Sequence, residues 1–328
     1  MEFGMPWPGP SVAAEAEQAG TAAFVTGEFA DHDPYVSLAE MVTTTTTAKC
    51  GSGIAYAFSR TPFAHATALR QLSRRAKGGL FAGLGSGAFR INRDWLSVPA
   101  DRPVARIGET VQALRAFLNA ENGERIVFKG EFYEIDAMIQ APILGKLDIP
   151  IVLGAFNKLM IQEAARVADG VIGHGLFTSR WWNDVVRPNS DSSDSGRGLE
   201  YGWVITAIND DDPQRAILDA RRMVGFYLTV KTYDPYVEFH GWQEPVERIR
   251  AAFAKGDMDG FAANVTDEIL ESITLCGTTE QATQMLAGRA GGLPRDIGFF
   301  SPPSFLVGRK RLEGYAHSSL ALIKDVTS

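Results

Sequence analysis

MEFGMPWPGPSVAAEAEQAGTAAFVTG, residues 1–27, contains the first repeat of the pattern that decides the fold. The apolar runs at 1–5 and 22–27 each have the length of a short strand. Residues 12–20 between them have the spacing of a helix, and Gly20 is a typical residue to end one. This order of strand, helix and strand predicts two parallel strands joined by a crossover helix.

The same alternation continues through most of the chain. Strands are expected to begin near residues 1, 22, 49, 80, 149, 170, 200 and 296. Helices are expected at 12–20, 35–46, 62–79, 102–120, 159–169, 212–228 and 278–292, with a hairpin at 124–135. Eight parallel strands with intervening helices are the content of a (β/α)8 TIM barrel, whereas an open doubly wound sheet usually has an early GxGxxG fingerprint. We therefore predict a single α/β barrel domain over 1–328, with insertions after strands four and seven, near 88–147 and 232–272.

Composition narrows the range of partners. A formal net charge of -7 argues against general binding to nucleic acid or to anionic membrane surfaces. Cys50 and Cys276 match no metal or redox spacing, so we expect two buried, reduced thiols. The chain has no run of about 18 apolar residues, and residues 1–10 lack the features of a signal peptide. We expect a cytoplasmic protein that acts on a small molecule.

Four titratable residues follow the second expected strand, in the segment TGEFADHDPY at 26–35. The loops after the strands of such a barrel form the face on which its enzymes keep their active sites. His32 is therefore a candidate for general acid or base, since an unperturbed histidine pKa of about 6.5 allows both forms near neutrality. Glu28 is a second candidate, and Asp33, before a proline, is expected to be structural. His174 has the same position after strand six, with fewer polar neighbours.

Glycine-rich segments follow strands four and five. Gly154, Ala155, Phe156 and Asn157 precede a helix, so their backbone NH groups could bind an anion, or could form an ordinary turn capped by Asn157. Gly85, Ser86 and Gly87 after strand four are open to the same two interpretations. With the aromatic residues at the strand ends, these segments suit a flat aromatic ligand with an anionic tail. A metal site is the weaker alternative, because Glu28, Asp31, His32 and His174 complete no familiar ligand set.

Five segments in order resemble the luciferase-like monooxygenase superfamily, whose (β/α)8 barrels bind flavin mononucleotide (FMN) or the deazaflavin coenzyme F420. They are GEFADHDPYVSLAEMVTTTTTAKCGSGIAYAFSRTPFAHATALRQLS, GLFAGLGSG, FKGEFYEI, IPIVLGAFNKLMIQEAARVADGVIGHG and LCGTTEQATQMLAGRAGGLPRDIGFFSP. Glu28, the HDP triplet and SGIAYAFSRTP look most like the F420-dependent branch. Ala88 stands where sugar-phosphate dehydrogenases of the superfamily have an acidic residue, which argues against a sugar-phosphate substrate.

The resemblance implies an F420-dependent oxidoreductase that transfers a hydride between the deazaflavin and a small organic substrate, and that forms a homodimer. It implies a bulge after strand three, with a non-proline cis peptide at Ser52, Gly53 or Ile54 backing the ring. His32 and Glu28 are the expected catalytic residues. The expected cofactor-binding residues are Asp31, Ser52, Gly53, Ile54, Gly85, Ser86, Gly87, Gly154, Ala155, Phe156, Asn157 and His174. The alternatives are an FMN-dependent monooxygenase that uses reduced flavin and O2, and a barrel that binds a ligand without catalysis.

Overall fold

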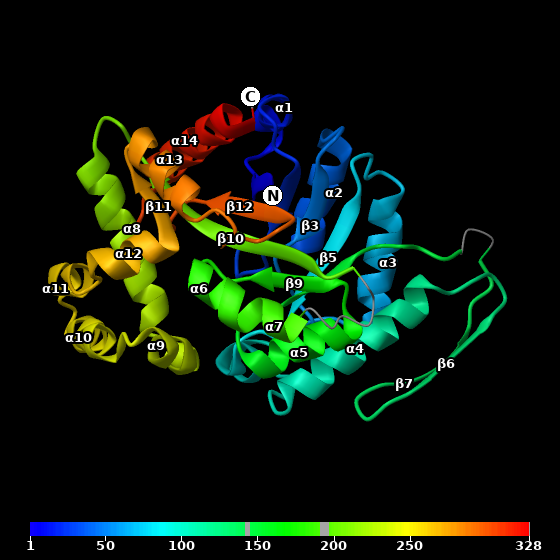
Figure 1. The fold of residues 1–328 in the computed structure, drawn as a ribbon. Coiled ribbons are helices and arrows are strands. Elements are labelled where there is room, and N and C mark those ends of the chain that lie inside the picture. Colours follow the sequence, from blue (N-terminus) through cyan, green and yellow to red (C-terminus); the bar gives the residue numbers. More distant parts are fainter. Residues whose placement is uncertain (142–144, 191–196, 328) are drawn as a thin grey trace.

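Eight parallel strands form a closed ring in the computed structural model, which describes residues 1–141, 145–190 and 197–327 (Figure 1). The ring closes because β10 pairs with β9 on one side and with β12 on the other. In order around the ring the strands are β1 (Glu2–Pro6), β2 (Ala23–Thr26), β3 (Lys49–Ser52), β5 (Leu80–Gly85), β8 (Ile151–Gly154), β9 (Gly170–Gly173), β10 (Leu199–Ile208) and β12 (Ile297–Ser301). The predicted TIM barrel is confirmed.

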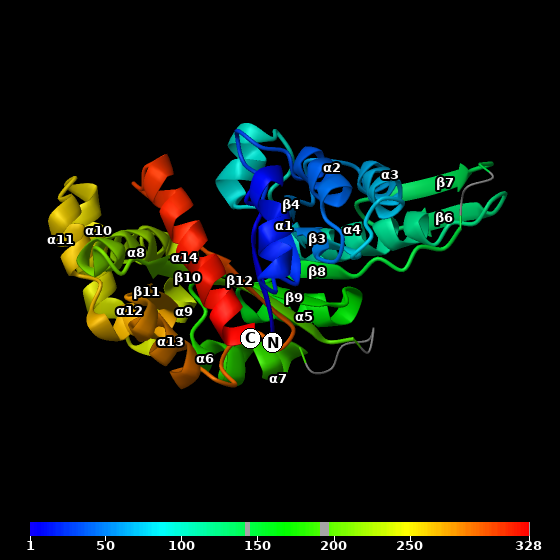
Figure 2. The same cartoon turned by 90° about the horizontal axis from the view of Figure 1, so that it is seen from above.

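Helices surround the ring, as Figure 2 shows from above. The helices between successive strands are α1 (Pro10–Gln18), α2 (Pro34–Thr44), α3 (Pro62–Ser73), α4 (Pro103–Leu118), α5 (Lys158–Val167), α8 (Pro213–Leu228) and α13 (Thr279–Gly288). Several begin with proline, whose missing NH costs nothing in a first turn. Asp33, Thr61 and Asp212 cap α2, α3 and α8 by accepting hydrogen bonds from first-turn NH groups.

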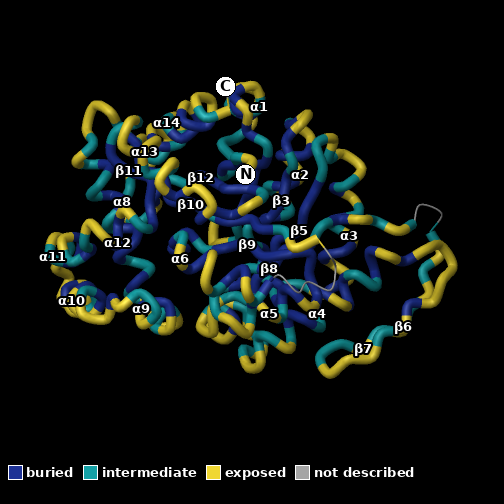
Figure 3. The backbone as a smooth tube through the Cα atoms, in the orientation of Figure 1, coloured by how far each residue is buried: buried dark blue, intermediate teal, exposed yellow. Residues whose placement is uncertain are grey.

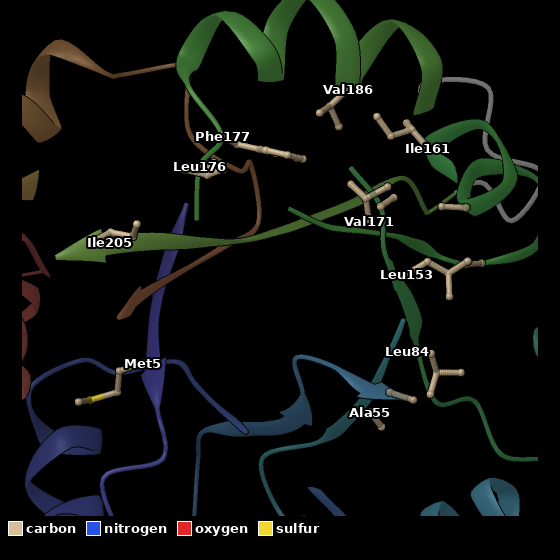
Figure 4. Close-up of a cluster of buried hydrophobic side chains, with 14 of the residues drawn as sticks. Met5, Ala55, Leu84, Leu153, Ile161, Val171, Leu176, Phe177, Val186 and Ile205 are labelled. Carbon is tan, nitrogen blue, oxygen red and sulfur yellow. The ribbon is translucent and has the colours of Figure 1, made fainter. Parts of the chain in front are cut away.

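The core has an inner and an outer part, because successive side chains of a strand point to opposite faces. The barrel interior is filled by Ala23, Val25, Phe81, Val152, Ile172, Tyr201, Ile297 and Phe299. The larger cluster lies between strands and helices, where Leu153 and Val171 pack with Ile161 and Val186 (Figure 4). The strand ring is mostly buried, and exposed positions concentrate on the outer helices and the β6–β7 hairpin (Figure 3).

Two segments interrupt the simple alternation. Between β5 and β8 lie the π-helix η1 (Ile91–Trp95), α4 and a hairpin of β6 (Arg125–Lys129) and β7 (Glu134–Met138), which projects from the barrel (Figures 1 and 2). A surface cleft between α4 and this hairpin contains none of the predicted site residues. Between α8 and α13 lie η3 (Lys231–Tyr233), α9 (Asp234–His240), α10 (Gln243–Ala254), α11 (Met258–Ala263), α12 (Asp267–Ile273) and β11 (Thr274–Gly277).

Some boundaries differ from the sequence prediction. The strand expected at 49–58 is two pieces, β3 and β4 (Ala55–Tyr56), because the chain bulges between them. The strand β11 was not predicted; it pairs with the second half of β10, beyond the end of β9. The helices α6 (Ser179–Trp181), α7 (Arg187–Ser190) and α14 (Arg309–Thr327) and the π-helix η2 (Trp182–Val186) were not predicted either.

The ends of the chain meet on one side of the barrel. Thr327 in α14 donates a hydrogen bond to the carbonyl of Ala19, next to α1. Cys50 and Cys276 are buried and unpaired, as predicted. Within the described part of the chain, no helix is both long and apolar enough to cross a membrane.

Candidate active site

Glycines occupy inward-facing positions at the carboxyl ends of several barrel strands. Gly53 lies inside the barrel, because a Cβ there would come within 2.5 Å of Val25 Cγ2 and 3.0 Å of Ile172 Cδ1. Gly85 and Gly154 continue the inward-facing positions of β5 and β8 beyond Phe81 and Val152. The missing side chains leave room for neighbouring side chains inside this end of the barrel.

Ile54 is the side chain that these glycines accommodate. A Cβ at Gly85 would lie 2.7 Å from Ile54 Cδ1, and one at Gly154 would lie 3.2 Å from Ile54 Cγ2. The peptide bond between Gly53 and Ile54 is cis, which confirms the expectation for this bulge. The predicted residues Gly53, Ile54, Gly85 and Gly154 therefore come together across three neighbouring strands.

Ser52 differs from its predicted neighbours. Its buried hydroxyl donates to the carbonyl of Gly83 at 2.8 Å and accepts from the Gly83 NH at 3.1 Å. Both bonds tie β3 to β5 within the barrel wall. A ligand could therefore contact Ser52 only through its main chain.

The loop after β2 carries Asp31 and His32 in a tight turn. The backbones of Phe29 and His32 exchange two hydrogen bonds, and His32 Nδ1 lies 2.6 Å from Asp31 Oδ1. The side chains of His32 and Asp31 are 44% and 82% exposed. No described protein group forms a hydrogen bond with His32 Nε2. The carboxylate thus orients the imidazole and leaves one ring nitrogen available to a ligand.

Glu28 has a different environment from His32. Its carboxylate accepts from the backbone NH of Tyr56 at 2.7 Å and from Arg60 Nη1 at 2.9 and 3.0 Å. Arg60 also donates to Asp33, the cap of α2. Burial raises the pKa of the Asp33 carboxyl, but the backbone NH groups of Val36 and Tyr35 and the Arg60 guanidinium outweigh this effect, so the pKa is lowered. Arg60 thus fixes the loop after β2 to β4. Its role was not predicted, because it follows β3 while its partners follow β2.

The segment Gly154–Asn157 leads from β8 into α5. The Asn157 carbonyl accepts from the NH groups of Met160 and Ile161, as expected at the start of a helix. The Asn157 side chain makes no cap, and its buried Oδ1 has no hydrogen-bond partner within the described part of the chain. The first NH groups of α5 thus remain available to an anion.

A second unpartnered amide lies in the segment after β5. Gly87 has a φ of 70°, and Asn92 Nδ2 donates to the carbonyl of Ser86 at 2.7 Å. Asn92 is buried, and none of the described residues hydrogen-bonds to its Oδ1. Sequence reasoning missed Asn92, since one asparagine at the start of an irregular helix has no distinguishing pattern. An unpaired buried oxygen beside the glycine turn fits a ligand that supplies a donor.

His174 follows β9 and lies among aromatic rings. Its ring centroid is 5.6 Å from that of Phe156, 4.5 Å from that of Tyr227 and 5.2 Å from that of Tyr233. Burial lowers the pKa of His174 to about 4. The structure thus brings together His174 and Phe156, two of the residues predicted to bind the cofactor, and adds the two tyrosines of α8 and η3, which were not predicted.

These residues fit a planar ligand with an anionic tail. Glycine backbone, Ile54 and the aromatic rings offer flat apolar surface, the start of α5 offers NH groups, and Asn92 and Asn157 offer unpaired acceptors. Among the described residues, no three histidine, cysteine, aspartate or glutamate side chains could hold a metal ion together.

Comparisons with known proteins give the same architecture. A model of the family "Luciferase-like monooxygenase" matches residues 10–294. An uncharacterized protein from Mycobacterium tuberculosis is 27% identical over 277 residues, covering 80% of this chain and 81% of that protein. A 5,10-methylenetetrahydromethanopterin reductase from Archaeoglobus fulgidus is 24% identical over 272 residues, 80% of each chain. The solved structure of the coenzyme F420-dependent tetrahydromethanopterin reductase from Methanopyrus kandleri has a TM-score of 0.75 at 20% identity, covering 95% of this chain and 96% of that one.

Proposed function

Since the chain belongs to the luciferase-like monooxygenase family, we propose that it is a coenzyme F420-dependent oxidoreductase acting on a small organic substrate. The observation that carries the proposal is the contact of Ile54 with Gly85 and Gly154, next to the free start of α5. This arrangement suits a flat ring joined to an anionic tail. When bound, F420 would supply the carbon that gives or accepts a hydride.

The residues divide into holding and proton-transfer roles. Gly53, Ile54, Gly85 and the Gly87 turn would hold the ring, and Gly154–Asn157 would bind the anionic tail. Between the two predicted catalytic residues, the contacts favour His32 for moving the proton. The His32 Nδ1 is held by Asp31, and its Nε2 has no hydrogen-bond partner among the described residues, whereas the Glu28 carboxylate is already engaged by Arg60 and Tyr56.

The choice of F420 over FMN is supported by similar proteins that use F420. The Methanopyrus kandleri structure is that of a coenzyme F420-dependent reductase. The family description, a monooxygenase, favours FMN as the second candidate. An FMN enzyme of this class would take reduced flavin from a partner and react it with O2.

Equilibrium titration of the purified protein with F420 and with FMN, followed by cofactor fluorescence, tests the proposal. We expect saturable F420 binding, with FMN at least tenfold weaker. Gly154→Val should weaken F420 binding, because its Cβ would already lie 3.2 Å from Ile54 Cγ2. Gly308→Val is the matched control, since nothing lies within 4 Å of a Cβ there. Tighter binding of FMN than of F420 would contradict the proposed cofactor.

A further inference from the structure

Phe29 and His32 face the same side of the turn after β2. The backbone NH of Phe29 donates to the carbonyl of His32 at 3.1 Å, and the NH of His32 donates back to the carbonyl of Phe29 at 3.3 Å, so the two residues form an antiparallel bridge. Directly opposite residues of an antiparallel pair project from the same face, with Cβ atoms roughly 4.5–5.5 Å apart. The Phe29 ring therefore projects beside the His32 imidazole.

Trp95 extends this surface with a second ring. Its ring centroid lies 5.6 Å from that of Phe29, so η1, which follows β5, contacts the loop after β2. Phe29 and Trp95 are 55% and 57% exposed. Two half-exposed rings that pack on each other form an apolar patch, and such patches mark sites for ligands or partners. This patch lies at the carboxyl ends of the barrel strands, where enzymes of this fold bind their substrates.

The position of Trp95 is fixed by the start of η1. The backbone NH of Asn92 donates to the carbonyl of Ala88 at 3.1 Å, and its side-chain Nδ2 donates to the carbonyl of Ser86 at 2.7 Å. The Asn92 carbonyl accepts from the NH of Val98 at 3.0 Å. These bonds anchor η1 to the end of β5, so the Trp95 ring is held in place before a ligand arrives. A preorganised ring loses little conformational freedom when a ligand binds to it.

Charged side chains close to the two rings in the sequence are paired with each other. His32 Nδ1 lies 2.6 Å from Asp31 Oδ1. Arg93 donates to the two carboxylate oxygens of Asp94 at 2.5 and 3.0 Å. A flat uncharged group gains free energy by covering the rings, whereas an ion placed there would lose water and find these charges already paired.

We propose that Phe29 and Trp95 are specificity-determining residues that hold a planar apolar part of the substrate beside His32. A substrate that exchanges a proton with His32 must bring its reacting atom within hydrogen-bond reach of Nε2. The bridge between Phe29 and His32 then places the neighbouring part of that substrate on the two rings. The substrate class is an aromatic or similarly flat apolar compound whose reacting group lies close to the ring. This assignment rests on the proposed function, in which His32 moves the proton.

Two probes with the same carbon skeleton test the flat surface. β-Naphthol is planar and its saturated counterpart β-decalol is not, and ligand-observed NMR titration of the full chain measures the affinity for each. Trp95→Leu and Phe29→Leu keep apolar bulk, so each should weaken β-naphthol about three- to tenfold, the effect of losing one aromatic contact, and change β-decalol much less. Phe63→Leu is the matched control: Phe63 is 52% exposed and packs against Phe117 with ring centroids 5.4 Å apart, on the outer helix α3, and its replacement should change neither affinity.

The NMR signals of the indole NH groups show where the probe binds in the wild type. The Trp95 signal, identified by its absence in Trp95→Leu, should shift when β-naphthol is added. An unshifted Trp95 signal at saturation, no binding of β-naphthol at millimolar concentration, or an equal loss of affinity in Phe63→Leu would each overturn the inference. Competitive displacement of β-naphthol by F420 would assign the rings to the cofactor instead. Dissociation of an oligomer in both Trp95→Leu and Phe29→Leu, measured by sedimentation velocity, would show that a second copy covers the rings.

The proposed function can fail independently of this inference. The probe titrations use protein without cofactor, and F420 titration of the same samples reports on the cofactor alone. If F420 did not bind while both leucine variants still weakened β-naphthol, the proposed cofactor would be wrong and the contact with the rings would stand. If F420 bound and β-naphthol did not, the inference about the rings would fail alone.

Discussion

Replacing Arg60 with methionine is the sharpest test of how the loop after β2 is held. Arg60 is 20% exposed and Glu28 13% exposed, so their ion pair is largely shielded from water. Arg60 Nη1 contacts both Glu28 oxygens, and Nη2 contacts Asp33. Methionine keeps most of the apolar stem and removes all of these hydrogen bonds.

The expected loss follows from the partners left behind. Breaking a fully buried pair by removing one partner costs about 3–5 kcal/mol. Glu28 retains the donors of Tyr56 and Ser59, and 40% of the Asp33 side chain is exposed, so both carboxylates stay partly solvated or bonded. We therefore expect a free energy of unfolding about 2–3 kcal/mol lower than in the wild type.

Urea unfolding followed by tryptophan fluorescence measures this loss. Arg125→Met is the matched control. The side chains of Arg125 and its ion-pair partner Asp136 are 61% and 56% exposed, so removing this pair should not measurably change the free energy of unfolding. The pKa of Asp33 is lower in the folded protein than in the unfolded chain. Its stabilising contribution to folding is therefore complete above the unfolded pKa of about 4 and is lost as the pH falls through the folded pKa. The difference in the free energy of unfolding between the wild type and Arg60→Met should become smaller below pH 4. Equal stability of the two methionine variants at pH 7 would refute the assigned role of Arg60.

Three further predictions concern stability and the glycine turn. Burial lowers the pKa of His65, His174 and His240 to about 4, so as the pH falls the unfolded chain takes up protons on these side chains before the folded chain does. The free energy of unfolding should therefore be highest above a pH of about 6.5 and should fall toward pH 4. A urea midpoint that stays constant over this range would contradict the prediction. Gly87→Ala should lower the free energy of unfolding by about 1–2 kcal/mol, measured by heat or urea, because the backbone φ of Gly87 is positive. Gly308→Ala is the control. An equal loss of stability in both variants would exclude backbone strain as the cause. Ser52→Ala should lower the free energy of unfolding by about 1–3 kcal/mol, because the Gly83 NH and carbonyl lose their hydrogen bonds to the Ser52 hydroxyl. The affinity for F420 should not change. A large loss of affinity would show that the hydroxyl contacts the cofactor.

The barrel could be predicted because its signal is local. Each strand is a short apolar run and each crossover helix is periodic, so residues 1–27 already contain the repeating unit. The missed strand β11 shows the limit of this reasoning. Thr274–Gly277 pairs with β10 only because β10 is ten residues long and extends past the end of β9. No pattern within four residues can report the length of a distant neighbour.

The site could be predicted only where its parts are neighbours in sequence. Asp31 and His32 are adjacent, and Gly154–Asn157 is continuous, so their types and order were informative. Arg60 forms a hydrogen bond with Glu28, 32 residues away in the sequence, and Tyr233 forms one with His174, 59 residues away. These pairs exist because different loops meet at one end of the barrel, and a single sequence does not show which loops touch.

The two histidines at the strand ends show what three-dimensional contacts add to residue type. Both follow barrel strands, and the sequence made His32 a candidate for proton transfer and His174 a candidate for binding the cofactor. His32 has one nitrogen held by Asp31 and the other without a described partner, so that nitrogen could hydrogen-bond to a ligand. His174 has one nitrogen occupied by a backbone NH and the other by Tyr233, so gaining or losing a proton would break a hydrogen bond. The two histidines therefore differ in their hydrogen bonds: among the described residues one ring nitrogen of His32 has no partner, whereas both ring nitrogens of His174 are engaged.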